Sequence, residues 1–272
     1  GGHRCHQNGP QPQQGGAIDF DRLRDLARRH RPKLVLCGYS SYPRDLDYGP
    51  FKAIADEVGA LTMADISHVG GLVAGGVLAN PLDAGFDFVT TTSHKSLRGP
   101  RGGLILTRRR HAKQIDASVC PGLQGGPHMN VIAGIAVTLK LAATAAFQAY
   151  SRQVLANAKA LAEALLAGGL TLVTGGTDNH LLVIDTIASR DLDGAAAERA
   201  LDQIGITTNK QVIPDDPRPP LRPSGVRLGT PAATTRGMGP AEMRELAQLI
   251  VKALTSPEDS AQLADLQRDC LA

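Results

Sequence analysis

A lysine in the stretch "FDFVTTTSHKSLRGPRGGLIL", from Phe86 to Leu106, has neighbours suited to chemistry. An apolar run ending in small hydroxyl residues precedes Lys95, and a turn of glycines, a proline and arginines follows it. A strand that ends in hydroxyl residues points its last side chains into a crevice, and a glycine-rich turn can approach an anion closely. An amine between them either anchors a phosphate or acts as a nucleophile towards a carbonyl group.

Polar side chains close two further apolar runs, "KLVLCGYS" and "LTMADISH". Ligands of an open parallel sheet bind outside the carboxyl ends of its strands, so we expect the polar groups at these ends to converge. The groups are Ser40, Asp65, Ser67, His68, Thr92, Ser93, His94 and Lys95. We expect Asp65 to be buried, where a bare carboxylate is costly unless a cation, such as a protonated pyridine nitrogen, meets it.

The elements that must position these groups alternate between strand-like and helix-like patterns. Apolar runs predict strands over residues 33–40, 61–67, 86–93 and 102–107, and residues 51–60 have helical periodicity with a closing glycine. This alternation predicts an α/β fold with a mainly parallel sheet.

The pattern changes after "CPGLQGGPHMN". Val131 to Ala167 is rich in Ala and Leu and predicts one long helix or two abutting ones. Further strands are predicted at 170–176, 180–186 and 225–231, further helices at 194–205 and 239–254, and an ordered loop at Ile213 to Gly225. We therefore expect a partial large domain over residues 1–146 and a small C-terminal α/β domain over residues 147–272.

Composition excludes several classes of protein. The 272 residues are 42% hydrophobic, and with 3% aromatic residues, no Trp and a formal charge of +3 we expect no nucleic-acid partner. The widely spaced cysteines argue against a zinc site or a disulfide framework and fit a reducing cytoplasm; they are Cys5, Cys37, Cys120 and Cys270. No run of about 18 apolar residues could span a bilayer, and the first residues lack the apolar core of a signal peptide. We expect a cytoplasmic protein with no metal site and no membrane partner.

Five blocks carry a resemblance to a known family: "ADISHVGGLVAGG", "TTTSHKSLRGPRGG", "CPGLQGGPHMNVIAG", "GGTDNHLLVID" and "SGVRLGTPAATTRG". In this order the chain resembles the serine hydroxymethyltransferases, from about Asp19 to Leu254. These are pyridoxal-phosphate enzymes of the aspartate-aminotransferase fold, fold type I. The resemblance implies a homodimer or dimer of dimers that interconverts serine and glycine, with tetrahydrofolate as the one-carbon carrier.

The resemblance also implies the roles of the residues around the lysine. Lys95 would form a Schiff base with pyridoxal 5'-phosphate, and Asp65 would pair with its pyridine nitrogen so that the ring acts as an electron sink. His68 and Ser40 would lie near the phenolic oxygen of the ring. Arg101 would lie close to the lysine and the substrate, as a catalytic candidate.

Other matched residues lie further along the chain. Arg227 in "SGVRLG" resembles the arginine that clamps the substrate carboxylate, because a fork-shaped guanidinium suits bidentate binding. Gly125 and Gly126 resemble the loop whose amides reach the cofactor phosphate of the neighbouring subunit. The remaining cofactor-binding candidates by resemblance are Thr92, His94 and, in the initial "GGH", His3.

Several features depart from the family pattern. The family's N-terminal region has no counterpart before "GGH", so we expect a truncated or partial chain that catalyses poorly alone and leaves apolar strand and helix faces uncovered. Gln211 stands where the family usually has an asparagine near the folate, and Ser93 and Ser96 replace threonines. We interpret the cation cluster "RRRH", Arg108 to His111, as a solvated strand end.

Three hypotheses follow. The first is a serine hydroxymethyltransferase, the second a folate-independent aldolase or transaldolase acting on β-hydroxy amino acids, and the third a non-catalytic remnant of the fold. Intact Asp65, His68, Lys95 and Arg227 argue against the third, whereas the shortened N-terminal region supports it.

Overall fold

The computed structural model describes residues 17–271, and their contacts divide the chain into two units. Within the described range, unit 1 comprises residues 20–40 and 45–151, and unit 2 comprises residues 17–19, 41–44 and 152–271. Both units combine helices with a four-stranded sheet, so the predicted α/β class is confirmed.

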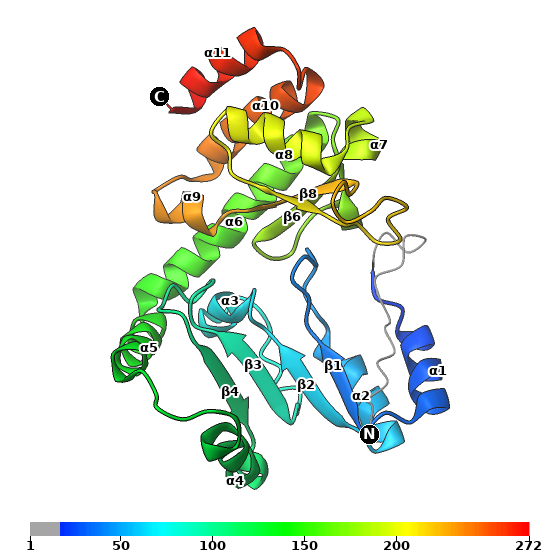
Figure 1. The fold of residues 1–272 in the computed structure, drawn as a ribbon, viewed down its shortest axis with the longest axis vertical. Helices are drawn as coiled ribbons and strands as arrows, with labels where there is room; N and C mark the ends of the chain where they lie inside the picture. Colours follow the sequence, from blue (N-terminus) through cyan, green and yellow to red (C-terminus); the bar gives the residue numbers. More distant parts are fainter. Residues whose placement is uncertain (1–16, 272) are drawn as a thin grey trace. The chain divides into compact units, whose positions relative to one another are not determined.

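Unit 1 is built on a sheet in the order β1-β2-β3-β4 (Figure 1). Strands β1, β2 and β3 are parallel and β4 is antiparallel to β3, which confirms the predicted mainly parallel sheet. The elements are α1 (Phe20–His30), β1 (Leu34–Cys37), α2 (Tyr48–Val58), β2 (Leu61–Asp65), α3 (Gly70–Ala74), β3 (Phe88–Thr92), β4 (Gly103–Thr107), α4 (Arg109–Ala117), η2 (Ser118–Leu123) and α5 (Met129–Ala142).

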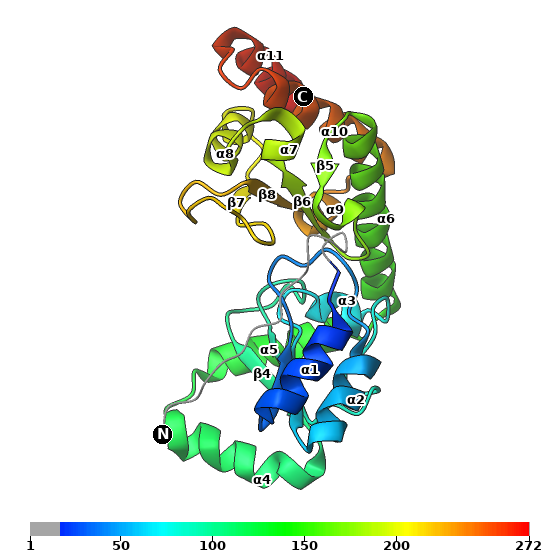
Figure 2. The same cartoon turned by 90° about the vertical axis from the view of Figure 1, so that its right-hand side faces the viewer.

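Helix α2 covers one face of this sheet, with α1 packed against it (Figure 2). The helix begins where the Asp47 side chain accepts the Gly49 N–H at 3.0 Å, and it ends at Gly59, whose φ of 70° favours glycine. Its buried Phe51 meets Phe20 of α1 edge to face, with ring centroids 5.1 Å apart.

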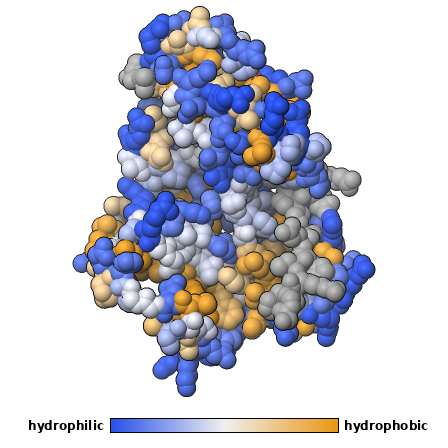
Figure 3. All heavy atoms as spheres, viewed as in Figure 1, coloured by the Kyte–Doolittle hydropathy of each residue, from blue (hydrophilic) through white to orange (hydrophobic). Residues whose placement is uncertain are grey.

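The opposite face of the sheet is open and apolar. Side chains alternate along each strand, so Val35 and Cys37 are buried against the helices while Leu34 and Leu36 are 43% and 57% exposed. Leu61 on β2 and Ile105 on β4 are also more than 40% exposed, and Figure 3 shows apolar side chains gathered over these strands and α5. The expectation of uncovered apolar strand and helix faces is confirmed for the described residues.

The Ala/Leu-rich stretch forms two helices, α5 and α6 (Ala145–Ala167), and the boundary between the units falls inside α6. Thr144 accounts for the break, because its hydroxyl donates to the Leu141 carbonyl at 2.7 Å and accepts the Phe147 N–H at 3.3 Å. Among the described residues no single helix is long and apolar enough to cross a membrane; only α5 and α6 together, bent by 78°, meet that length and composition.

Unit 2 contains an antiparallel sheet in the order β5-β6-β8-β7. Its core joins α6, α8 and α10 to the sheet through fully buried side chains such as Leu165, Leu201 and Ile250. Its elements after α6 are β5 (Thr171–Leu172), η3 (Val173–Gly175), β6 (Leu181–Asp185), α7 (Thr186–Arg190), α8 (Gly194–Gln203), β7 (Asn209–Gln211), β8 (Gly225–Gly229), α9 (Pro231–Thr235), α10 (Pro240–Thr255) and α11 (Ser260–Leu271).

The proline-rich segment is ordered, as predicted, around one carboxylate. Asp216 accepts the Ile213 N–H at 3.3 Å and the Ser224 N–H at 2.8 Å, so it ties the two ends of the loop together. Burial acts to raise the pKa of Asp216, but these hydrogen bonds outweigh it and lower the pKa.

The arginines of the cation cluster after β4 are exposed, as expected of a solvated strand end, but two members of the cluster also contact a buried carboxylate. Arg110 forms an ion pair with Asp87, a residue only 3% exposed, and His111 Nε2 lies 3.4 Å from the same carboxylate. Burial alone would raise the pKa of Asp87, but hydrogen bonds from Thr62, Arg110 and His111 lower it to about 2. Arg110 therefore neutralises a buried carboxylate.

Candidate active site

The carboxyl ends of β1, β2 and β3 form one edge of the unit 1 sheet, because the three strands are parallel. Asp65 is the last residue of β2 and Thr92 the last residue of β3, while exposed Ser40 follows β1 after a short turn. The structure therefore brings these predicted site residues to the same edge.

Two predicted residues are in direct contact at this edge. Lys95 Nζ lies 3.0 Å from His68 Nε2, and the lysine is exposed while the histidine is half-buried. A protonated lysine can donate a hydrogen bond to an Nε2 atom without a proton, and a neutral lysine can accept a hydrogen bond from an Nε2 atom that carries one. The pair can thus hold one proton between an amine and an imidazole.

The loop that carries Lys95 is closed by its own hydrogen bonds. Ser93 N–H donates to Gly102 O at 3.0 Å, and Gly99 N–H donates to Ser93 O at 2.7 Å. The Ser93 hydroxyl donates to Pro100 O at 2.6 Å. Ser93, one of the serines that replace a threonine, therefore fixes the loop rather than facing a ligand.

Helix α3 supports the same loop from the other side. Gly71 N–H donates to Ser96 Oγ at 2.9 Å. A Cβ on Gly71 would lie 2.2 Å from the Ser96 carbonyl oxygen, so only glycine allows this approach. The residue after the lysine is thus held in contact with the first turn of α3.

Asp65 is exposed, so the expectation that it is buried is wrong. It ends its strand at the sheet edge, and its carboxylate accepts the Ser67 N–H at 2.8 Å. Beside it, Thr90 pairs with Asp65 in register and so projects from the same face. Thr90 Oγ1 is buried and has no hydrogen-bond partner within residues 17–271. An open carboxylate beside an unsatisfied hydroxyl fits the binding of a further polar group.

Other predicted residues surround the lysine loop less closely. Thr92 Oγ1 donates to Ser67 O at 3.3 Å, and the Gly102 N–H donates to His94 Nδ1 at 3.4 Å. Arg101 is exposed in this loop. Gly125 and Gly126 lie in the exposed segment after η2, where Gly126 has a φ of 59°. His3 lies outside the described residues.

Arg227 belongs to unit 2, where it occupies the middle of β8. Its guanidinium is half-buried and donates from Nη2 to Asn209 Oδ1 at 3.2 Å and from Nη1 to Ser41 Oγ at 3.5 Å. Burial lowers the pKa of Arg227. Neither Asn209 nor Ser41 is singled out by the sequence pattern, although pairing of 209–211 with "GVRLG" would have placed Asn209 opposite the arginine.

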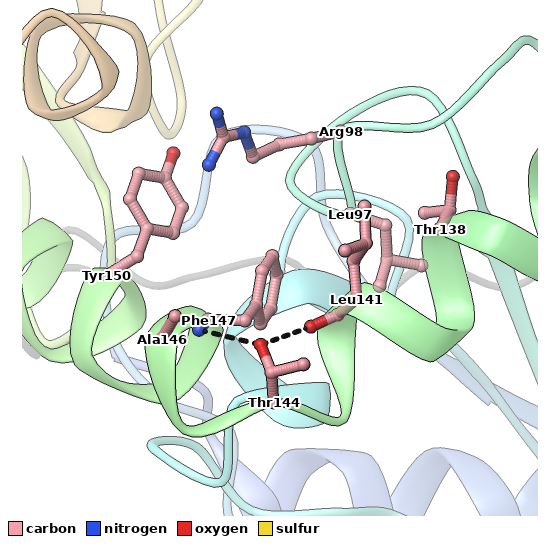
Figure 4. Close-up of a pocket in the computed structure, with 8 residues that line it drawn as sticks. All are labelled: Leu97, Arg98, Thr138, Leu141, Thr144, Ala146, Phe147 and Tyr150. Atoms are coloured by element: carbon pink, nitrogen blue, oxygen red, sulfur yellow. Dashed lines mark hydrogen bonds between the residues drawn. The ribbon is translucent and has the colours of Figure 1, made fainter.

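A cavity of about 310 Å³ lies behind the lysine loop (Figure 4), but it contains none of the predicted cofactor residues. Its floor is apolar, and at its rim the Arg98 guanidinium lies over the Tyr150 ring, 4.6 Å from the centroid. The lining residues are Leu97, Arg98, Thr138, Leu141, Thr144, Ala146, Phe147 and Tyr150. We interpret it as space left at the bend between α5 and α6, because the chemistry-bearing side chains lie at the sheet edge.

The groups at the sheet edge suit a cofactor that bears an aldehyde and a basic ring nitrogen. An exposed primary amine next to an imidazole is a nucleophile with a proton partner, and an open carboxylate can pair with a protonated ring. The residues therefore fit such a cofactor.

Comparisons with known proteins identify the family. Residues 11–250 match the family model described as serine hydroxymethyltransferase. The chain is 52% identical over 250 residues to the serine hydroxymethyltransferase of Myxococcus xanthus (strain DK1622), covering 92% of this chain and 59% of that protein. It is 53% identical to those of Sorangium cellulosum (strain So ce56), over 91% of this chain and 58% of that protein, and Synechococcus sp. (strain JA-3-3Ab), over 92% and 60%. The chain thus spans well under two thirds of the length of these relatives.

Proposed function

The chain belongs to the serine hydroxymethyltransferase family, and on that basis we propose that it takes part in the pyridoxal-phosphate-dependent interconversion of serine and glycine, with tetrahydrofolate as the one-carbon carrier. One observation carries the proposal: the Lys95 amine lies 3.0 Å from the His68 imidazole, at the sheet edge that also bears Asp65. The chain spans only 58–60% of the length of these relatives. The proposal therefore concerns a protein of the relatives' full length, of which this chain would supply part.

Pyridoxal phosphate would be held by Lys95 through its amine and by Asp65 through an ion pair with the ring nitrogen. When bound, the cofactor supplies an electron sink for bonds at the amino-acid α-carbon. The unsatisfied Thr90 hydroxyl beside Asp65 supports a polar ligand at this position. Ser40, Thr92 and His94 contribute the remaining polar groups around the cofactor.

The other residues bind substrate or move protons. His68 exchanges a proton with Lys95 Nζ, since the two nitrogens are within hydrogen-bond distance. Arg227 binds the substrate carboxylate through its two terminal nitrogens. Arg101, which is exposed, neutralises negative charge near the amine. Gly125 and Gly126, in an exposed segment, offer backbone amides to the phosphate held by a second subunit.

We further propose the division into a large domain of aspartate-aminotransferase type at residues 1–146 and a small domain at residues 147–272, in a cytoplasmic homodimer or dimer of dimers. The two compact units of the structure, whose boundary in α6 lies between Ser151 and Arg152, support the division. The oligomer rests on the family resemblance, and the compartment rests on the widely spaced cysteines.

The test is glycine formation from serine by the full-length protein, with and without tetrahydrofolate. Folate-dependent turnover that disappears in Lys95→Ala supports the proposal. Folate-independent cleavage of β-hydroxy amino acids at a comparable rate favours the aldolase alternative instead. Absence of both activities in a protein that binds no pyridoxal phosphate would contradict any catalytic function.

A further inference from the structure

The guanidinium of Arg227 begins a chain of hydrogen bonds within unit 2 that the proposed function does not use. Arg227 Nη1 donates to Ser41 Oγ at 3.5 Å, and Ser41 Oγ donates to Gln211 Oε1 at 2.6 Å. Gln211 Nε2 then donates to the Val212 carbonyl at 2.9 Å. A guanidinium has only donors and a backbone carbonyl only acceptors, so the direction of every bond in this chain is determined.

The strand pairing explains why these groups meet. Asn209 of β7 is the register partner of Arg227 of β8, and Gln211 lies two residues beyond Asn209. Side chains two residues apart in a strand project from the same face, so Asn209, Gln211 and Arg227 share one face of the sheet. Ser41 approaches that face from the segment 41–44, which belongs to the same unit.

The short bond between Ser41 and Gln211 decides what the serine offers to Arg227. A hydroxyl has one proton, and at 2.6 Å that proton is committed to Gln211 Oε1. The remaining lone pairs of Ser41 Oγ face the guanidinium and can only accept. At 3.5 Å the hydrogen bond from Nη1 is weak by itself. It can still orient the guanidinium, because the bond to Gln211 already fixes the orientation of the Ser41 hydroxyl.

Two terminal nitrogens of the arginine therefore have acceptors on different elements. Nη2 contacts Asn209 Oδ1 on β7, and Nη1 contacts Ser41 Oγ on the preceding segment. Bidentate binding of a carboxylate needs the plane of the guanidinium to be fixed, because two parallel hydrogen bonds must form together. Acceptors on two sides restrict rotation of that plane before the ligand arrives.

We propose that Ser41 and Gln211 are positioning residues for Arg227, which hold its guanidinium in the orientation that receives the carboxylate of an amino acid. The inference rests on the proposed role of Arg227 as the carboxylate-binding residue. Gln211 replaces the asparagine usual in the family, and its longer side chain is the one that engages Ser41. This departure from the family pattern thus has a structural use beside Arg227.

The first test measures ligand affinity on the cofactor-loaded full-length protein. Ser41→Ala and Gln211→Met should each weaken glycine binding about tenfold, and the double variant should be little worse than either single one, since both act through one chain. Ethanolamine, which lacks a carboxylate, should bind all variants equally. Ser41→Thr keeps a hydroxyl and should retain near-normal glycine affinity. Gln203→Met, at an exposed glutamine at the end of α8, is the matched control.

The second test needs no cofactor or substrate. In arginine-labelled protein, NMR should show slow rotation of the Arg227 guanidinium in the parent and faster rotation in Ser41→Ala and Gln211→Met. Unchanged rotation and glycine affinity in both variants would overturn the inference, even if Arg227→Lys abolishes glycine binding. If Arg227→Lys binds glycine normally, the proposed role of Arg227 fails. The rotation rates then still decide whether Ser41 and Gln211 hold the guanidinium.

Discussion

Lys95 Nζ and His68 Nε2 lie 3.0 Å apart although 27 residues separate them in the chain. The contact forms because β2 and β3 are parallel neighbours, so the segments that leave their carboxyl ends emerge side by side. An amine next to an imidazole has a proton partner, and this distinguishes Lys95 from a lysine that merely faces solvent.

Lys95 should be the residue that pyridoxal phosphate modifies. Incubation of the full-length protein with the cofactor, reduction with borohydride and peptide mapping should locate the adduct on Lys95, because its amine faces the carboxyl edge of the sheet. His68→Ala should slow labelling without moving it to another lysine. An adduct on Lys33 or Lys210 would remove Lys95 from the proposed site.

Arg227→Lys should separate substrate binding from cofactor binding. The variant keeps the charge but loses the two-pronged geometry, so serine affinity should fall by roughly 2 to 4 kcal/mol while pyridoxal phosphate binds normally. Calorimetric titration of each ligand measures the two effects. Lys210→Arg, at a lysine exposed on β7, is the control, and normal serine binding by Arg227→Lys would exclude this arginine from the site.

Gly71→Ala should disturb the lysine loop. The new Cβ would lie 2.2 Å from the Ser96 carbonyl oxygen, so α3 or the loop must shift, at a cost of about 1 to 3 kcal/mol in stability. Borohydride labelling of Lys95 should also decrease in Gly71→Ala. Gly103→Ala is the matched control, because the nearest atom to its Cβ would be 3.9 Å away. Equal stability and labelling in the two variants would show that the close approach is unimportant.

Asp87 should make the protein sensitive to acid. Its folded pKa, about 2, lies below the ordinary value of 3.8, so the ionised form stabilises the fold. This contribution, roughly 2 kcal/mol, is complete above the ordinary value and is lost as the pH falls through the folded pKa. The free energy of unfolding of the parent protein, measured with urea, should therefore decrease as the pH falls from about 4 to about 2. Asp87→Asn should be less stable at neutral pH and show a smaller acid dependence; an equal dependence would contradict the assignment.

The open face of the unit 1 sheet should cause self-association of residues 1–272 expressed alone. Leu36 is 57% exposed beside other uncovered apolar side chains, so Leu36→Gln should shift the chain towards smaller species in sedimentation experiments. Leu166→Gln, at a leucine that is 40% exposed on α6 and lies outside the unit 1 sheet, should have little effect. A parent chain that is monodisperse and monomeric would contradict this prediction.

Much of the fold follows from local patterns. The strands predicted over residues 33–40, 61–67 and 86–93 are confirmed, because each is a compact apolar run closed by polar residues, although they end earlier than predicted, at Cys37, Asp65 and Thr92. The helix break at Thr144 is contained in one of the two alternatives for the Ala/Leu-rich stretch. By contrast α1 and α4 were missed. Both helices are amphipathic, but they contain many charged residues and no apolar run of the kind that indicates the other elements.

Only those site residues that come directly after a predicted strand could be placed from the sequence. The convergence of His68 and Lys95 is implied by parallel strands, and the structure agrees. Burial of Asp65 depends on what covers the sheet edge, which no local pattern specifies. The contact between Ser41 and Gln211 joins residues 170 positions apart, so it requires the folded arrangement of β7 and the segment 41–44.

The hydrogen-bonded loop around Lys95 restricts the motion of the lysine amine. Bonds from Ser93 and Gly99, together with the contact between Gly71 and Ser96, fix the backbone on both sides of the lysine. The volume that Nζ can sample is then set by the torsions of the lysine side chain alone. Freezing those torsions when the amine reacts costs at most about 2 kcal/mol, and the backbone contributes no comparable entropy loss because folding has already ordered it.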